Sequence, residues 1–217
     1  MGYQAGCGSQ GASAIAIGNQ AGQVSQNLNC IAIGTLAGEN AQVDYAVALG
    51  REAGQNFQGN NAVAVGRLAG ENKQGASATA IGYQAGCGDQ GTHSIAMGQN
   101  AAKVSQSNNA IAIGQTAGCN QQAEFAVAIG YTAGCADQGT SAVAVGDIAG
   151  RNSQGDKAVA VGDNAGRASQ GTKSVAVGHY AAPVSQGDFA VAVGDVAGSN
   201  AQGDYSVAIG NTAARNS

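Results

Sequence analysis

The chain is short of the residues that build a thick globular core. Its 217 residues include no tryptophan, one proline and only 4% aromatic residues. So few large side chains cannot fill the interior of an ordinary domain of this length. Disorder is not indicated either, because 44% of the residues are hydrophobic and the net charge is only −4.

Charge and long apolar runs are also scarce. Charged residues make up 10% of the chain, and its nine Lys and Arg are scattered, so no nucleic-acid partner is expected. No apolar run approaches the roughly 18–20 residues of a membrane span. A charged n-region followed by an apolar h-region, typical of a signal peptide, is also absent. The sequence therefore predicts no membrane insertion of this segment.

What the chain has instead is glycine, 36 residues in all, and a 16-residue repeat. Thirteen copies follow one another without insertion over 10–217, after a partial repeat at 1–9. Numbered within each copy, position 1 is always Gln, positions 7 and 12 always Ala, and position 9 always Gly. Positions 6 and 8 carry Val, Ile, Leu or Met, with Thr79 as the exception. We expect a single domain in which these repeats are the structural units.

The repeat predicts an all-β parallel β-solenoid. Positions 5–8 alternate small and branched residues, which favours a short strand. Glycines at positions 9 and 13 favour turns, so each repeat is expected to form one coil. Coils stacked about 4.8 Å apart would make a rod on the order of 60 Å long. Stacked Gln amides at position 1 are expected to hydrogen-bond between coils, as in other cross-β stacks.

The alternation also gives each strand two faces. We expect the branched side chains at positions 6 and 8 to form the structural core, as at Val63, Val65, Val159, Val161, Val191 and Val193. The alanines at positions 5 and 7 would then point outward, and a flat apolar face of this kind favours contact with another chain. The expected oligomer face includes Ala16, Ala48, Ala64, Ala128, Ala160 and Ala192. The alternative is an exposed alanine face on a soluble monomer, and the oligomeric mass in solution separates the two.

Several stretches resemble a known family. "NNAVAVG" (60–66), "SVAVG" (174–178) and "SVAIG" (206–210) are similar to the Ser-Val-Ala-Ile-Gly core of the YadA-type head repeats of trimeric autotransporter adhesins. "AIGYQAG" (80–86) with "QGTHSIAMG" (90–98) resembles the related repeats of viral and phage fibre proteins. The resemblance implies a left-handed β-roll, with three rolls packed around an axis. The family's repeat is usually slightly shorter, and its neck, coiled-coil stalk and membrane anchor have no counterpart in this sequence.

The five cysteines do not form a regular framework. Cys7, Cys87, Cys119 and Cys135 share position 14, and Cys30 stands at position 5. Only Cys119 and Cys135 occupy adjacent coils, where Cα atoms about 5 Å apart would allow a disulfide. An odd and irregular set favours free thiols, with Cys119–Cys135 as the one candidate bridge. Free thiols fit assembly in a reducing cytoplasm, as for a virion component.

No pattern indicates catalysis, a metal or a cofactor. His93 stands at position 4 and His179 at position 10 of distant coils, so they form neither a dyad nor a metal pair. Most coils lack the acidic residue that a calcium ladder needs, and no phosphate-loop Lys-Ser/Thr follows the glycine-rich strings. We therefore expect a protein that is not an enzyme.

The expected function is structural. The first hypothesis is a fibre or adhesin segment on a virion or extracellular surface, a rigid rod that attaches to a host surface protein or glycan. In this hypothesis the chain associates with two copies of itself to form a homotrimer. The alternative is a self-assembling filament whose coils stack end to end. A third hypothesis, ice binding, would need a threonine ladder, whereas the threonines here are scattered over several repeat positions.

Overall fold

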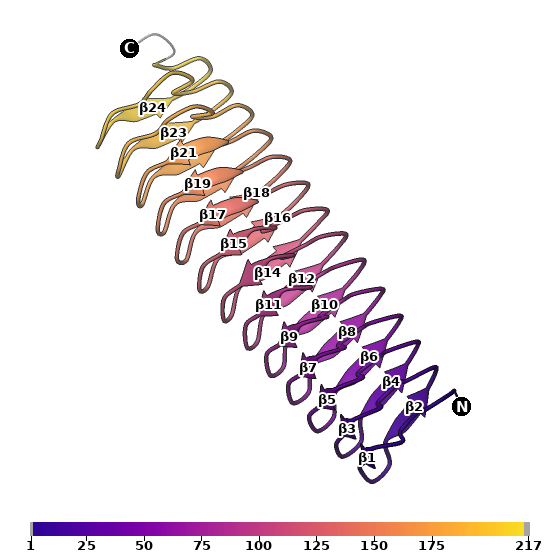
Figure 1. Ribbon diagram of the computed structural model, residues 1–217. Coiled ribbons are helices and arrows are strands. Elements are labelled where there is room, and N and C mark those ends of the chain that lie inside the picture. The colour runs from indigo at the N-terminus through magenta and orange to yellow at the C-terminus, as the bar shows by residue number, and fades with distance from the viewer. Residues whose placement is uncertain (1, 215–217) are drawn as a thin grey trace. The chain divides into compact units, whose positions relative to one another are not determined.

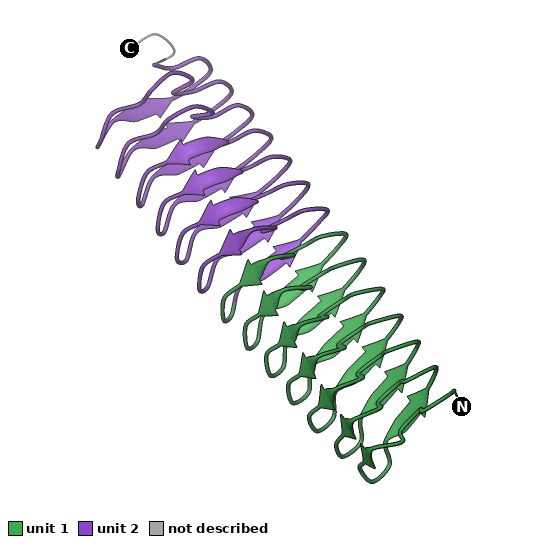
Figure 2. Ribbon diagram, in the orientation of Figure 1, with its two compact units in different colours: residues 1–109 green, residues 110–217 purple. Residues whose placement is uncertain are grey.

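The computed structural model describes residues 2–214, and these residues form strands and turns but no helix. The chain divides into two compact units, residues 1–109 and 110–217 (Figure 2). Each unit is a stack of coils, and the fold is an all-β parallel β-solenoid of about 13 turns (Figure 1). The predicted fold class is therefore confirmed. Over the residues described, no helix is long and apolar enough to cross a membrane.

The first unit holds two parallel sheets on opposite walls of the coils (Figure 1). One wall consists of three-residue strands at repeat positions 6–8: β2 (Ile15–Ile17), β4 (Ile31–Ile33), β6 (Val47–Leu49), β8 (Val63–Val65), β10 (Thr79–Ile81) and β12 (Ile95–Met97). The other wall consists of two-residue strands that end at position 1: β1 (Ser9–Gln10), β3 (Ser25–Gln26), β5 (Ala41–Gln42), β7 (Phe57–Gln58), β9 (Lys73–Gln74), β11 (Asp89–Gln90) and β13 (Ser105–Gln106).

The second unit repeats this arrangement. The wall at positions 6–8 contains β14 (Ile111–Ile113), β16 (Val127–Ile129), β18 (Val143–Val145), β20 (Val159–Val161), β22 (Val175–Val177), β23 (Val191–Val193) and β24 (Val207–Ile209). The facing wall contains β15 (Gln121–Gln122), β17 (Ala136–Gln138), β19 (Asn152–Gln154) and β21 (Ala168–Gln170). Single bridges continue that wall from Gln170 to Gln186 and from Gln186 to Gln202.

Within each unit, successive strands of a wall pair in parallel and in register. Ala64 lies beside Ala80, and Ala144 beside Ala160, so each position stacks on its own equivalent. The turns are paired in the same way; the Gly146 N–H, for example, donates to the carbonyl oxygen of Ile129 at 2.8 Å. An insertion in one coil would shift every stacked row, which explains the constant repeat length.

The interior of each coil is lined by alanine. No Val, Ile, Leu or Met among the described residues is buried, whereas the alanines at position 7 are buried in every coil except the first, where Ala16 is half-buried. The predicted orientation of the strands is therefore wrong. The residues predicted as core lie half-buried on the outside: Val63, Val65, Val159, Val161, Val191 and Val193. Those predicted as the outward oligomer face include five that are buried inside the coil, Ala48, Ala64, Ala128, Ala160 and Ala192, and one that is half-buried, Ala16.

The physical reason is the thinness of the coil. A Cβ atom added to Gly166, in the turn opposite β20, would lie 3.1 Å from the Cβ of Ala160. It would also lie 2.8 Å from Oε1 of Gln170 on the facing wall. Only methyl groups fit between walls this close, because interiors pack to near crystal density. The branched side chains must therefore point outward.

Glutamine at position 1 fills the part of the coil interior that the alanine methyl groups do not occupy. Gln138 is 2% exposed, and its side chain crosses the coil. Its Nε2 donates to the carbonyl oxygens of Val127 at 2.8 Å and Ala142 at 3.3 Å on the other wall, and to Oε1 of Gln154 at 3.2 Å in the next coil. The predicted hydrogen bonds between stacked glutamines are confirmed, and the same amides also join the two walls.

The turn after each strand at positions 6–8 depends on glycine at position 9. Gly66 has a φ of 123°, a conformation that L-residues rarely adopt. A Cβ there would also lie 2.8 Å from the carbonyl oxygen of Gly82, the equivalent residue of the next coil. Both the backbone conformation and the stacking therefore require glycine, as the sequence predicts.

Candidate functional site

The outer side of the strands at positions 6–8 carries the main unexplained apolar surface. We call the side chains at positions 6 and 8 the aliphatic face. Because successive residues of a strand point to opposite sides, a buried alanine at position 7 places both neighbours outside. Ile17 is 47% exposed, Ile33 38% and Ile129 38%. Each unit thus presents rows of half-exposed branched side chains that no other part of the same unit covers.

The aliphatic face contains no charged residue. Register stacking aligns its members in continuous rows, so that Val159 pairs with Val175 and Val161 with Val177. Solvated sheet faces normally carry polar side chains, and large contiguous apolar patches on soluble proteins mark interaction sites. This arrangement can bind another apolar surface. Its only polar side chain among the described residues is that of Thr79, and it has no titratable group.

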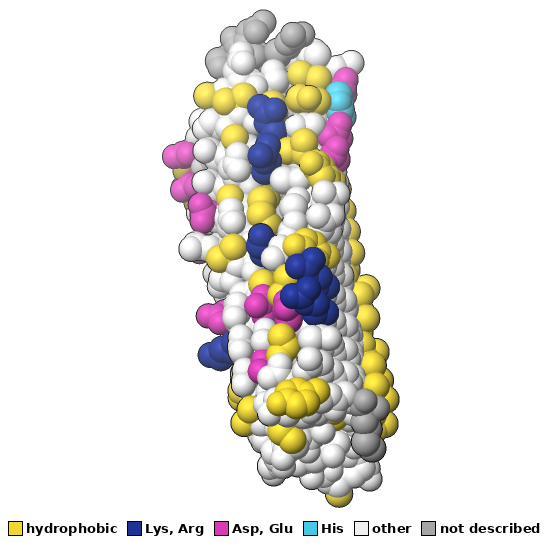
Figure 3. Space-filling view, turned by 45° about the vertical axis from the view of Figure 1, so that its right-hand side comes forward, with side chains coloured by type: hydrophobic (Ala, Val, Ile, Leu, Met, Phe, Trp, Pro, Cys, Tyr) yellow, Lys and Arg dark blue, Asp and Glu magenta, His cyan; other side chains and the backbone are white. Residues whose placement is uncertain are grey.

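The facing wall is different on its outside. In the first unit, asparagines at position 15 form a ladder in which Asn40 Nδ2 donates to Asn56 Oδ1 at 3.0 Å and Asn56 Nδ2 to Asn72 Oδ1 at 3.1 Å. Val104 and Val184 are isolated apolar members of the same position, each 52% exposed. On the surface seen in Figure 3, Lys and Arg side chains lie directly beside Asp and Glu side chains near the middle of the view.

Two cysteines are joined. Cys119 and Cys135 form a disulfide between adjacent coils, with Cα atoms 4.7 Å apart, so the one pair singled out from the sequence is bonded. The remaining cysteines are free thiols: Cys7 exposed, Cys30 buried and Cys87 half-buried. Burial raises the pKa of the Cys30 thiol. Burial, together with a hydrogen bond to Glu71 and the charge of that carboxylate, raises the pKa of Cys87 to about 12. Neither of these two thiols is a ready nucleophile.

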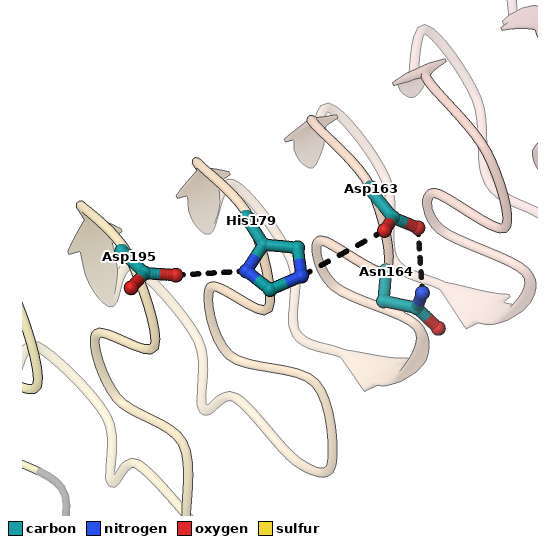
Figure 4. Close-up of polar contacts among 4 residues, drawn as sticks. All are labelled: Asp163, Asn164, His179 and Asp195. Carbon is teal, nitrogen blue, oxygen red and sulfur yellow. Dashed lines mark hydrogen bonds and ion pairs between the residues drawn. The ribbon is translucent and has the colours of Figure 1, made fainter.

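His179 belongs to a polar row at position 10 (Figure 4). Its Nδ1 lies 2.8 Å from Oδ1 of Asp195 in the following coil, and its Nε2 lies 3.8 Å from Oδ2 of Asp163 in the preceding one. Asn164 Nδ2 donates to the other oxygen of Asp163 at 2.6 Å. All three charged or titratable side chains are about half exposed, so the row is a surface feature.

The two histidines lie in different units, His93 in the first and His179 in the second. Among the residues that the structure describes, no three His, Cys, Asp or Glu side chains are placed to hold a metal ion. The sequence predicted no catalytic, cofactor or metal residue, and that stays a prediction.

The aromatic side chains are on the surface. Tyr45, Phe125 and Phe189 at position 4 are 52%, 52% and 41% exposed. Near the end of the second unit, the rings of Phe189 and Tyr205 stack with centroids 5.1 Å apart, and Lys173 Nζ lies 4.9 Å from the Phe189 centroid. Both faces of the Phe189 ring are therefore covered by its neighbours.

With the fold and the aliphatic face described, the chain can be compared with known protein families. Two segments match the YadA head domain repeat. They are residues 90–117 and 185–213, so the predicted resemblance is confirmed for these parts of the chain. A search among curated proteins and a search among solved structures each gave no match. Both YadA head repeat segments include residues of the aliphatic face, such as Ile95 and Met97 in the first and Val191 and Val193 in the second.

The sequence-based interpretation missed which face of the strand is free. A usable signal was present at positions 7, 12 and 1, which hold only Ala, Ala and Gln. Strict limitation to a methyl group on both walls indicates close approach, and an invariant polar side chain that spans a gap indicates an interior hydrogen bond.

Proposed function

We propose that this chain is a segment of a surface adhesin that associates as a homotrimer through the aliphatic face. The three solenoids would form a stiff support for attachment on a cell or virion surface. The observation that carries the proposal is the row of half-exposed Val and Ile side chains at positions 6 and 8, such as Val159, Val161 and Val175. The number three and the surface location rest on the YadA head repeats, which occur in trimers at the cell surface.

The energetics favour association. Half-exposed aliphatic side chains still present apolar area to water, and burial stabilises by about 25 cal/mol per Å². The coil interior is lined mainly by alanine methyl groups and glutamine amides, so the larger aliphatic side chains remain on the outside, where association can bury them. The proposed role is mechanical and adhesive, and it requires no catalytic residue.

Sedimentation equilibrium tests the proposal. We expect a mass three times the 21.0 kDa of the chain. A double variant, Val159→Asp with Val161→Asp, should shift the mass toward one chain, because buried unpaired carboxylates strongly oppose contact. Val184→Asp places the same change at an exposed valine off the aliphatic face and should leave the trimer intact.

Circular dichroism controls for folding. If the Asp variant loses its β signal, Val159→Thr with Val161→Thr makes a milder change on the same face. A wild-type mass of one chain would overturn the proposal. Long unbranched fibres in electron micrographs would replace it by the filament hypothesis.

A further inference from the structure

A shallow polar groove occurs at the same repeat positions in both units. In the second unit it encloses about 280 Å³ and is lined by Asp137, Ser153, Gln154, Gly155, Gln170, Gly171, Thr172 and Asp188. In the first it encloses about 200 Å³ and is lined by Lys73, Gly75, Asp89, Gln90, Gly91, Thr92, Ser105, Gln106 and Asn108. Both sets come from positions 16, 1, 2 and 3, so the repeat itself builds the groove.

Glycine at position 2 forms the floor. A Cβ atom at Gly155 would lie 2.7 Å from backbone atoms of Gly171 and Thr172 in the next coil. The side chains at positions 16 and 3 rise on either side, so consecutive Gln-Gly pairs leave a trough between two polar rims. The trough follows the stacking direction, because adjacent coils contribute equivalent residues to it.

The backbone of the groove is already paired. The Gly155 N–H donates to the Gln170 carbonyl oxygen at 2.7 Å, and the Gly171 N–H to that of Gln186 at 2.7 Å. An extended peptide could not pair its main chain here, since β-strand addition needs a free edge. A ligand must therefore hydrogen-bond to the side chains of the rims.

One rim carboxylate is held in place. The Thr172 N–H donates to Oδ1 of Asp188 at 2.7 Å, which fixes that carboxylate while Oδ2 can accept a hydrogen bond from a ligand. In the first unit the Thr92 N–H holds Asn108 Oδ1 in the same way, at 2.9 Å. Fixed acceptors reduce the entropy lost on binding.

We propose that this groove binds a neutral, linear glycan. In the second unit its rims offer the hydroxyls of Ser153 and Thr172 beside two carboxylates, and in the first unit the Asn108 amide and the Lys73 ammonium join hydroxyls and a carboxylate. All of these groups hydrogen-bond to sugar hydroxyls, and the rim positions recur along one direction as the units of a polysaccharide do.

In the second unit Asp137 and Asp188 disfavour nucleic acids and sulfated chains by charge repulsion. In the first unit Lys73 and Asp89 carry opposite charges, so a strongly charged ligand of either sign is not favoured in both grooves. The inference rests on the proposed adhesive function and adds a ligand to it. The groove uses none of the aliphatic-face positions, so trimer formation through that face does not consume its residues.

Ligand-detected NMR on the full chain tests the proposal, with cellohexaose, chitohexaose and maltohexaose as neutral probes. A heparin hexasaccharide and hexalysine serve as the anionic and cationic comparisons. We expect at least one neutral hexasaccharide to bind. Thr172→Trp fills the groove and should weaken this binding about tenfold or more. Asp188→Asn keeps the acceptor for the Thr172 N–H but replaces Oδ2, and should weaken it about fivefold. Gln115→Trp, an exposed change at position 10, is the matched control and should leave binding unchanged.

Three results would overturn the groove assignment: no binding of any neutral probe, equal binding by all variants, or binding of hexalysine or heparin alone. Circular dichroism confirms that each variant folds. The mass of the same samples separates the two proposals. A trimer that binds no neutral probe removes the groove and leaves the adhesin support, whereas a monomer that binds one removes the trimer and leaves the groove.

Discussion

The two sides of each strand at positions 6–8 differ in the size of side chain that they accept. On the inner side, Ala160 is fully buried, and a Cβ atom added to Gly166 in the turn would lie 3.1 Å from its methyl group. On the outer side, Val159 and Val161 are half-exposed and have no neighbour across from them within their unit. The small residue therefore fixes the thickness of the coil, and the larger residues supply surface for association. In this molecule the larger aliphatic side chains are not the buried ones, because the thin interior is filled by alanine methyl groups and glutamine amides.

The largest loss of stability should come from placing a larger side chain on the inner side of the strand. We expect Ala160→Leu to lower the free energy of unfolding by about 3 kcal/mol or more, since overpacking forces walls apart that backbone hydrogen bonds hold together. Urea unfolding followed by circular dichroism measures it, at a fixed protein concentration. Ala168→Leu adds the same atoms at position 15, where the next coil carries an exposed valine, and should change stability by less than about 0.5 kcal/mol. Equal losses for both variants would contradict the contrast between inside and outside.

The second-largest loss of stability should come from removing the glutamine amide that joins the two walls. Gln138→Leu keeps the approximate shape but removes three hydrogen bonds of Nε2, to Val127, Ala142 and Gln154. It also removes the Oε1 that accepts from Gln122 Nε2 at 3.1 Å. We expect a loss of about 2 kcal/mol. The control is Gln121→Leu, an exposed glutamine directly before Gln122 in the preceding coil, with an expected change near zero. A stable Gln138→Leu variant would mean that the glutamine acts by volume alone.

Period, strand placement and turns were predictable because each follows from local backbone rules. Gly66 needs its positive φ, and the alternation at positions 5–8 needs an extended chain, whatever lies across the coil. Which side of the strand faces inward depends on the distance between walls, and one strand alone does not contain that distance. The preference for burying valine over alanine gave the wrong orientation, because that rule assumes a core with room for both. Because the orientation was wrong, the exposed candidate surface is formed by the branched residues at positions 6 and 8, and not by the alanines.

A third and smaller change in stability is expected at position 11, which lies in a turn where the spacing between the walls does not limit side-chain size. Val196 has a φ of 58°, which is costly for a β-branched residue. Asparagine tolerates this region, and Asn164 occupies it at the same repeat position. We expect Val196→Asn to stabilise by about 0.5–1 kcal/mol, measured as a higher urea midpoint. Val184→Asn makes the same exchange at an exposed position of ordinary φ and should be neutral; a destabilised Val196→Asn would show that its packing outweighs the backbone strain.

The smallest effect should arise on the polar surface, at the row in Figure 4. His179 lies between Asp163 and Asp195 in three successive coils, but its side chain is 56% exposed and theirs are 47% and 54% exposed. Water and salt screen such contacts, so His179→Asn should cost at most about 0.5 kcal/mol in low salt and less in 1 M NaCl. Urea unfolding at the two salt concentrations measures both values. A loss above about 1.5 kcal/mol would mean that surface rows, and not only the alanine and glutamine interior, hold adjacent coils together. Stability would then depend on the polar row at position 10 as well as on the two sides of the strand.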